Sequence, residues 1–269
     1  MYNILYTKMG NYISILTTST KKYGWKRDHH DCRDFVRDFD IKFETNVDLS
    51  PLGPKEIYNQ GHLGSCTANA IAYAYEFDEY KQCEEIKFTP SRLFIYYNER
   101  EIEGTINEDS GAAIRDGVKS INKIGVCPET DWPYDISQFA KKPKYDCYEI
   151  AKDHRSLEYK RVEQKIDQLK SALSNGFPIV FGFIVYESFE SVETAKTGIV
   201  TMPEPNESVL GGHAVCIVGY DDNKNTFKVR NSWGEKWGDK GYCYFPYKYI
   251  LNSYLASDFW TIQKIKDDE

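Results

Sequence analysis

The periodicity of the apolar residues changes near the middle of this 269-residue chain, and that change limits the folds it can adopt. Apolar residues recur every three or four positions at 65–82, from about 90 onwards, at 111–123 and at about 164–174, which predicts helices, the first with Ser65 as its N-cap. Runs rich in Val, Ile, Tyr and Phe predict strands at 179–186, 214–220, 226–230, 241–249 and 259–265. A helical half followed by a strand-rich half predicts an α+β fold with two lobes.

Composition and charge exclude several classes of protein. Hydrophobic residues make up 41% of the chain and the net charge is −7, which favours a folded protein with no general attraction to nucleic acid. The longest apolar run, 179–186, has about eight residues, whereas a membrane span needs about twenty. Residues 1–20 lack the apolar core of a standard secretory signal. We therefore expect a soluble chain without membrane insertion, and its compartment and oligomeric state stay open.

One of the seven cysteines has the surroundings of a nucleophile. Cys66 stands where a glycine-rich stretch, 60–65, meets the start of the first predicted helix. The unpaired N–H groups and positive dipole end of a helix favour a thiolate, so this position should lower the pKa of the thiol. The alternative is a buried structural cysteine at a helix start.

A histidine and an asparagine in the second half complete a candidate site. His213 follows Gly211 and Gly212 and opens the predicted strand 214–220, which suits a titratable ring at the mouth of a cleft, although a structural histidine fits as well. Asn231 ends a short strand before a Trp- and Gly-rich turn. It can initiate that turn, or it can accept the second N–H of an imidazole and so orient the ring toward a thiol.

Taken together and in chain order, these motifs resemble those of papain-like cysteine proteases of the cathepsin type. The resemblance is carried by Gln60-Gly61-x-x-Gly64-Ser65-Cys66, Gly212-His213-Ala214-Val215 and Asn231-Ser232-Trp233-Gly234, and it extends over about residues 45–265. It implies the papain-like two-lobe α+β fold, with an active-site cleft between a helical lobe (about 55–160) and an antiparallel, β-barrel-like lobe (about 161–265). The catalytic domain would span 42–269, after an N-terminal extension of residues 1–41.

The resemblance also implies roles for individual residues. Cys66 would be the nucleophile, His213 the general base and then acid, and Asn231 the residue that orients His213. Gln60 would stabilise the oxyanion, and Trp233 would shield the His213–Asn231 contact. The implied substrate-binding positions are Gly64, Ser65, Ser110, Gly111, Gly212, Ala214 and Trp233. The implied reaction is hydrolysis of peptide or protein substrates through a thioester, with no metal and no cofactor.

Two other functions remain compatible with these residues. One is a catalytically silent papain-like scaffold that binds peptides, although the presence of all four polar site residues speaks against it. The other is a thiol acyltransferase or transpeptidase, which differs only in the nucleophile of the second step.

The sequence departs from the family pattern in three places. Thr67 stands where the family usually has Trp, and Leu63 stands where it often has a cysteine. The usual long helical pro-region is not seen before the matching core. We hypothesise that the aromatic and charged stretch 23–38 lies in or near the cleft and restrains the enzyme as a zymogen. A packing arm or a disordered tail is the alternative, and surface charge explains residues 28–31 better than a metal site.

Overall fold

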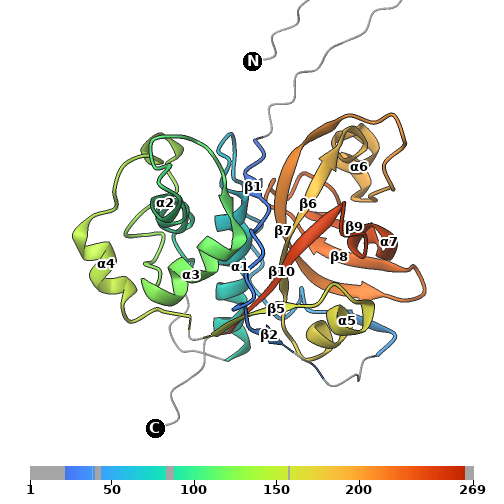
Figure 1. Cartoon of the computed structure of the whole chain (residues 1–269), viewed down its shortest axis with the longest axis horizontal. Coiled ribbons are helices and arrows are strands. Elements are labelled where there is room, and N and C mark those ends of the chain that lie inside the picture. The colour runs from blue at the N-terminus through green and yellow to red at the C-terminus, as the bar shows by residue number, and fades with distance from the viewer. Residues whose placement is uncertain (1–21, 38, 40–43, 83–87, 157, 264–269) are drawn as a thin grey trace, which may run out of the picture.

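The computed structural model describes residues 22–37, 39, 44–82, 88–156 and 158–263. It shows two lobes that meet at a central helix, with the helices of the first lobe on one side and the sheet of the second on the other (Figure 1). This is the predicted α+β arrangement of two lobes.

The helical lobe is built around α1 (Cys66–Lys81). Fourteen of its sixteen residues are buried, because other elements pack on every side of it. The remaining elements of this lobe are α2 (Arg92–Glu103), β4 (Ala112–Ala113), α3 (Ile114–Lys123), the short 3-10 helix η1 (Ile136–Gln138) and α4 (Tyr145–Ala151). The helices predicted from periodicity correspond to α1, α2 and α3, whereas α4 carries no clear apolar period and was not predicted.

The second lobe is built on an eight-stranded sheet. Its order is β2-β5-β10-β6-β7-β8-β9, with β3 also paired to β7. All pairs are antiparallel except β2 with β5. The strands are β2 (Val36–Arg37), β3 (Asn46–Asp48), β5 (Glu158–Val162), β6 (Ile179–Tyr186), β7 (Val209–Asp221), β8 (Thr226–Arg230), β9 (Tyr242–Pro246) and β10 (Ala256–Gln263).

Short helices connect these strands: α5 (Ile166–Ser174), the 3-10 helix η2 (Glu187–Glu190), α6 (Val192–Thr197) and α7 (Tyr247–Ile250). The strand predicted over 241–249 is wrong in its second half. The strand ends at Pro246, which lacks the N–H needed to continue a ladder, and residues 247–250 form α7. No helix of the described residues has the length and apolar character to cross a bilayer.

Helix α1 joins the two lobes. It packs against β7 and β10 on one side and against α2 and α3 on the other. Small residues at Ala68, Ala70, Ala72 and Ala74 are all buried along it. The first turn of α1 therefore meets the middle of β7, and the candidate site lies at that junction.

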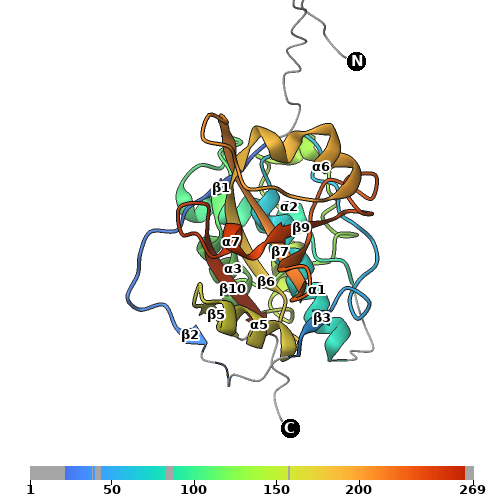
Figure 2. The same cartoon turned by 90° about the vertical axis from the view of Figure 1, so that its right-hand side faces the viewer.

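Residues 22–37, which we call the arm, run along the boundary between the lobes (Figure 1). Strand β1 (Trp25–Lys26) pairs in parallel with β4, so the arm is attached to the helical lobe there. The arm then passes along the outside of the molecule to β2, which pairs with β5 of the sheet lobe (Figure 2). The arm thus spans both lobes.

Candidate active site

The first turn of α1 positions Cys66. The residue begins the helix and is fully buried. Ser65 occupies the N-cap position that the sequence suggested, but its side chain makes no cap hydrogen bond to α1. Its hydroxyl instead contacts the Tyr134 hydroxyl and accepts a hydrogen bond from Asn69 Nδ2. The first N–H groups of α1 therefore remain directed at the region of the sulfur.

Adjacent strands bring His213 and Asn231 together. His213 lies within β7 rather than at its start, and Asn231 follows directly after β8. Their side chains are 2.8 Å apart, from His213 Nε2 to Asn231 Oδ1. Because a carbonyl oxygen only accepts, Nε2 carries the proton and Nδ1 is the nitrogen with a lone pair. Trp233 stacks on the imidazole at 5.0 Å between ring centroids, and it covers this hydrogen bond.

The sulfur of Cys66 lies against the strand that carries His213. Hydrogen bonds from the backbone of Ala214, the residue after His213, and of Gly24 reach the Cys66 thiol. The nucleophile candidate of the helical lobe therefore contacts the residue that follows the imidazole candidate of the sheet lobe.

Gln60 is buried beside the same junction. Its Nε2 donates to the carbonyl of Leu63 at 3.0 Å and to that of Lys22 at 3.2 Å. Its Oε1 accepts from the Ser232 hydroxyl at 2.8 Å, so the amide group is oriented with its N–H groups toward the cleft. An amide donor held in this way fits an oxyanion-stabilising role.

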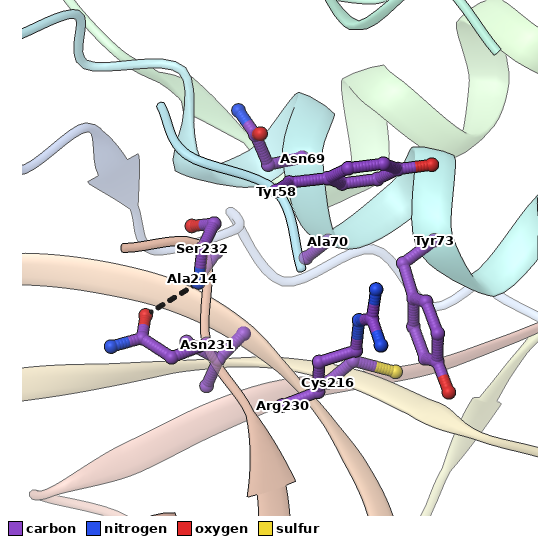
Figure 3. A pocket seen from close by; sticks show the side chains of 10 residues that line it. Tyr58, Asn69, Ala70, Tyr73, Ala214, Cys216, Arg230, Asn231 and Ser232 are labelled. Atoms are coloured by element: carbon purple, nitrogen blue, oxygen red, sulfur yellow. Dashed lines mark hydrogen bonds between the residues drawn. The ribbon is translucent and has the colours of Figure 1, made fainter. Parts of the chain in front are cut away.

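A buried arginine fixes the segments that carry Gln60 and Asn231. Arg230 ends β8 and donates to the carbonyl of Pro54 at 3.0 Å and to that of Glu56. Its guanidinium lies 4.2 Å from the Tyr73 ring centroid, facing α1, as Figure 3 shows. The cavity among these side chains has a volume of only about 10 Å³, close to that of one water position. It is a packing feature under the site rather than a binding pocket.

The arm occupies the cleft in front of these residues. The Tyr23 ring meets His213 edge-on at 6.1 Å and Trp233 at 6.3 Å. The carbonyl of Gly24 accepts from Ala112 N at 2.7 Å. A Cβ on Gly24 would stand 1.7 Å from the Gly64 carbonyl oxygen, so only glycine allows this approach.

Trp25 fills a pocket beside the site. Its indole lies over two glycines of neighbouring strands, because a Cβ on Gly182 would come within 1.9 Å of the ring and one on Gly212 within 2.7 Å. Gly182 pairs with Ala214 across β6 and β7. The only signal of this pocket in the sequence was the glycine that interrupts the apolar run 179–186.

Burial of Cys66 changes the pKa of its thiol. Burial, the largest cause, raises the pKa of Cys66 to about 11, and backbone hydrogen bonds from Ala214 and Gly24 only partly oppose this rise. The lowered pKa expected from the helix start is therefore wrong for the covered site. Desolvation of the anionic form outweighs the helix dipole here.

Among the other predicted substrate-binding positions, Gly64 and Gly111 meet Gly24 of the arm, whereas the buried Ser65 turns its hydroxyl to Tyr134. Gly64 donates its N–H to Asp109 Oδ1 at 2.9 Å, and Gly111 approaches Gly24 as closely as Gly64 does. The Ser110 hydroxyl turns instead to Thr105 Oγ1 and the Gly111 carbonyl. Sequence reasoning missed Asp109 and Tyr96, which hold this wall through a 2.7 Å hydrogen bond.

Other candidate features have ordinary surroundings. The described cysteines (Cys32, Cys66, Cys127, Cys147, Cys216 and Cys243) are free thiols, and Cys32 is the exposed one. Among the residues that the structure describes, no cluster of His, Cys, Asp and Glu has the makings of a metal site.

Comparison with known proteins agrees with this geometry. The model of the papain family of cysteine proteases matches residues 46–256. A peptidase C1-like protein of Acanthamoeba polyphaga mimivirus is 48% identical over 278 residues, covering 93% of this chain and 89% of that protein. Peptidase 1 of Psoroptes ovis is 26% identical, covering 76% of this chain and 61% of that protein.

Solved structures include two informative neighbours. Xylellain, a cysteine protease from Xylella fastidiosa, has a TM-score of 0.86 and 44% identity, covering 94% of this chain and all of that chain. ProCathepsin B S9 from Trypanosoma congolense has a TM-score of 0.70 at 17% identity, covering 98% and 94%, and so shares the fold.

Proposed function

Because this chain belongs to the papain family of cysteine proteases, we propose that it hydrolyses peptide bonds through a Cys66–His213–Asn231 triad. Gln60 supplies the oxyanion donor, and the arm holds the enzyme in a zymogen state. The observation that carries the proposal is the 2.8 Å hydrogen bond between His213 and Asn231, on the strand whose backbone contacts the Cys66 sulfur.

The chemistry follows from these positions. Cys66 gives its proton to His213 Nδ1, and the thiolate attacks the carbonyl carbon of the scissile bond. The side chain of Gln60 and the N–H of Cys66 stabilise the oxygen that becomes negative. His213 then protonates the leaving amine, and a thioester remains on Cys66. Water, deprotonated by His213, hydrolyses the thioester and releases the acid.

Asn231 and Trp233 serve the imidazole. Asn231 accepts the Nε2 proton and so keeps Nδ1 directed at the sulfur. Trp233 covers that hydrogen bond and lowers its exchange with water. The peptide substrate would lie where the arm lies, along Gly64, Ser65, Ser110 and Gly111 on one wall and Gly212 and Ala214 on the other.

The position of the arm supports the zymogen state. The Lys22 carbonyl accepts from Gln60 Nε2, so it occupies the place of a substrate oxygen. The sulfur meets the Gly24 backbone through a hydrogen bond rather than a carbonyl carbon in an attacking geometry. Trp25 fills the pocket over Gly182 and Gly212, which in a substrate complex would hold a bulky apolar side chain.

An active-site-directed epoxysuccinyl reagent tests this function. In the processed enzyme we expect it to label Cys66 and not the exposed Cys32, because Cys66 stands at the start of α1 against the strand that carries His213. Cys66→Ala should abolish labelling and peptide cleavage, whereas the matched control Cys32→Ser should keep both. Intact mass of the products separates hydrolysis from acyl transfer. Cleavage by the Cys66→Ala chain, or equal labelling of all thiols, would overturn the assignment.

A further inference from the structure

The arm contacts the two lobes in two different ways. We propose that it consists of a plug, residues 22–27, which must leave the cleft, and an anchor, residues 28–37, which remains part of the active enzyme. Processing then cuts the Arg27–Asp28 bond and makes Asp28 the new N-terminus. This inference rests on the proposed function, since it concerns how the same site becomes open.

The plug is held mainly by its backbone and by two aromatic rings. Gly24 pairs with Ala112, Tyr23 lies on His213, and Trp25 fills the pocket over Gly182. Its two lysine ion pairs, Lys22 with Asp109 at 3.6 Å and Lys26 with Glu103 at 2.7 Å, have lysine side chains about half exposed, at 55% and 42%. Such exposed pairs add little. Loss of the plug opens the cleft, and the two carboxylates left behind keep other donors: Asp109 accepts from the Gly64 N–H and the Tyr96 hydroxyl, and Glu103 accepts from the Ala113 N–H.

The anchor begins with a carboxylate that is fully enclosed. The Asp28 side chain is 0% exposed and accepts three hydrogen bonds from the body of the enzyme. The donors are Arg161 Nη2 at 2.8 Å, Trp260 Nε1 at 2.9 Å and the backbone N–H of Arg115 at 3.1 Å. Asp28 therefore ties the start of α3 to β5 and β10.

The rest of the anchor continues this connection. Asp34 binds both arginines, Arg161 Nε at 2.6 Å and Arg115 Nε at 3.1 Å. Residues Val36 and Arg37 add a strand to β5, and Arg37 pairs with Glu158 and donates to Gln263. The contacts of Val36 and Arg37 lie in the sheet lobe, whereas Asp34 also joins that lobe to Arg115 of α3.

The ion pairs of the anchor indicate that its removal would destabilise the protein. Arg115 and Arg161 face Asp28 and Asp34 from the arm and Asp258 from β10. Without the anchor, Arg161 would keep only Asp258, Arg115 would lose its ion pair with Asp34, and Trp260 would lose its acceptor. Stripping one partner from a buried ionic network destabilises a protein strongly. The active enzyme is therefore expected to keep residues 28–37.

A cut before Asp28 adds a positive charge to this ion-pair network. The backbone N–H of Asp28 donates to Asp258 Oδ2 at 2.9 Å. Hydrolysis of the Arg27–Asp28 bond adds the hydroxyl of water to the Arg27 carbonyl carbon and a proton to the Asp28 nitrogen, which becomes an ammonium group. The carboxylates of Asp28, Asp34 and Asp258 then face three cations, which are two arginine side chains and the new ammonium group. The hydrogen bond from the Asp28 nitrogen to Asp258 becomes charge-assisted.

The neighbouring residue is available to a second peptidase molecule. Arg27 is exposed, and its side chain donates to the Ser253 carbonyl at 3.0 Å. The chain's own sulfur faces Gly24 instead, so the cut occurs between molecules. This predicts a dependence of processing rate on protein concentration.

Two experiments on the full chain test the proposal. In the first, trypsin supplies the cut in an Arg33→Gln chain, which lacks the exposed tryptic site inside the anchor. We expect cleavage after Arg27, labelling of Cys66 by the epoxysuccinyl reagent at least tenfold faster, and retention of residues 28–37 by intact mass with an unchanged melting temperature. The same labelled species, beginning at Asp28, is expected when the wild-type chain processes itself. Active enzyme that begins after Arg37, no cut next to Arg27, or a cut chain with unchanged reactivity would overturn it.

In the second experiment, substitutions separate the two parts. Trp25→Ala should raise the rate of Cys66 labelling at least tenfold, whereas Asp28→Asn should lower the melting temperature without a comparable rise in labelling. Arg33→Gln is the matched control within the anchor and should change neither. If Asp28→Asn only speeds labelling, the anchor merely holds the plug and the proposal fails. Absence of Cys66 labelling in every variant would instead contradict the proposed function.

Discussion

At Cys66, two effects on one thiol oppose each other. The start of α1 favours the thiolate, but burial under the arm raises the pKa of the thiol to about 11. Since the thiolate is the reactive form, the covered thiol is almost entirely unreactive at neutral pH. Departure of residues 22–27 returns water to the sulfur and removes the main cause of the rise. The same side chain is therefore inert or nucleophilic depending on what covers it.

Gln60 gives a prediction at the level of a single side chain. Gln60→Ala should lower kcat of the processed enzyme about 10²- to 10³-fold, or about 3–4 kcal/mol of transition-state stabilisation, because one oxyanion donor is lost. KM should change little, since the donor acts mainly on the developing charge. Steady-state kinetics on one peptide substrate measures both constants.

Ser232→Ala is a graded control for this prediction. It removes the hydroxyl that orients Gln60 at 2.8 Å but leaves the amide donor present. We expect a smaller loss of kcat than in Gln60→Ala. Equal losses in the two variants, or a kcat of Gln60→Ala within threefold of the wild-type value, would speak against the oxyanion role.

Among the elements, the long ones were predictable from sequence and the short ones were not. Helices α1, α3 and α5 and strands β6 and β8 follow from apolar periodicity or composition over at least five residues. Strands β1 and β4 have two residues each, which is too short for any period, and they exist because glycines at 24, 64 and 111 let two backbones meet. Such a contact is tertiary, so the local sequence does not show it.

The candidate site was predictable to a similar extent. The identities of Cys66, His213, Asn231 and Gln60 came from motif order, because each motif is local in sequence. The contacts of the anchor could not be predicted from the sequence, because Arg115, Arg161 and Asp258 are ordinary charged residues on three separate elements. Only the fold brings them to Asp28 and Asp34.

Gly182 gives a prediction at the level of strand β6. Gly182→Ala places a methyl group where the Trp25 ring lies, 1.9 Å from its nearest atom, so the indole must leave the pocket. We expect faster labelling of Cys66 in the full chain, and in the processed enzyme a higher KM for peptides with a bulky aromatic residue in this pocket. Labelling kinetics and KM values for paired aromatic and small-residue peptides measure the two effects.

The double variant Trp25→Ala/Gly182→Ala is the control for this pair. Because the clash needs the indole, Gly182→Ala should add almost nothing to the labelling rate of Trp25→Ala. Additive effects in this double-mutant cycle would mean that Gly182 acts on the site by some route other than Trp25.

The ion-pair network of the anchor joins the arm to both lobes of the molecule, and it predicts that stability depends on pH. Burial, followed by the neighbouring carboxylate of Asp28, raises the pKa of Asp258 to about 6, although Arg161 opposes the rise. Arg161 also pairs with Asp34, which pairs with Arg115 in turn. Burial of Asp34 acts to raise its pKa, but hydrogen bonds and charges of the two arginines outweigh burial and lower it. A carboxyl whose pKa is raised on folding stabilises the fold below its unfolded pKa and loses that contribution as pH rises through 6.

The full chain should therefore become more stable as pH falls from 7.5 to 5. The contribution of Asp258 over its whole titration is on the order of 2–3 kcal/mol, a rise of several degrees in melting temperature. Below pH 4 the protonation of Asp34 acts in the opposite direction. Melting temperatures across pH 3.5–8 measure this dependence.

Asp258→Asn provides the comparison. Asparagine tolerates the positive φ of 61° at this position and can still accept from Asp28. We expect the rise between pH 7.5 and 5 to become shallower in this variant. An identical pH dependence in the two proteins would show that Asp258 is not the group responsible.

The meeting of Gly24 with Gly64 and Gly111 also determines which foreign inhibitors could imitate the plug. The space at this point admits only a backbone without side chains, because a single methyl group on any of the three residues meets a neighbouring backbone or carboxylate atom at 3.0 Å or less. A synthetic ligand built on the path of residues 22–25 must therefore present a glycine or another unsubstituted methylene at that point. Blockers with a side chain there would be rejected on shape alone, whatever their charge or affinity for the flanking pockets.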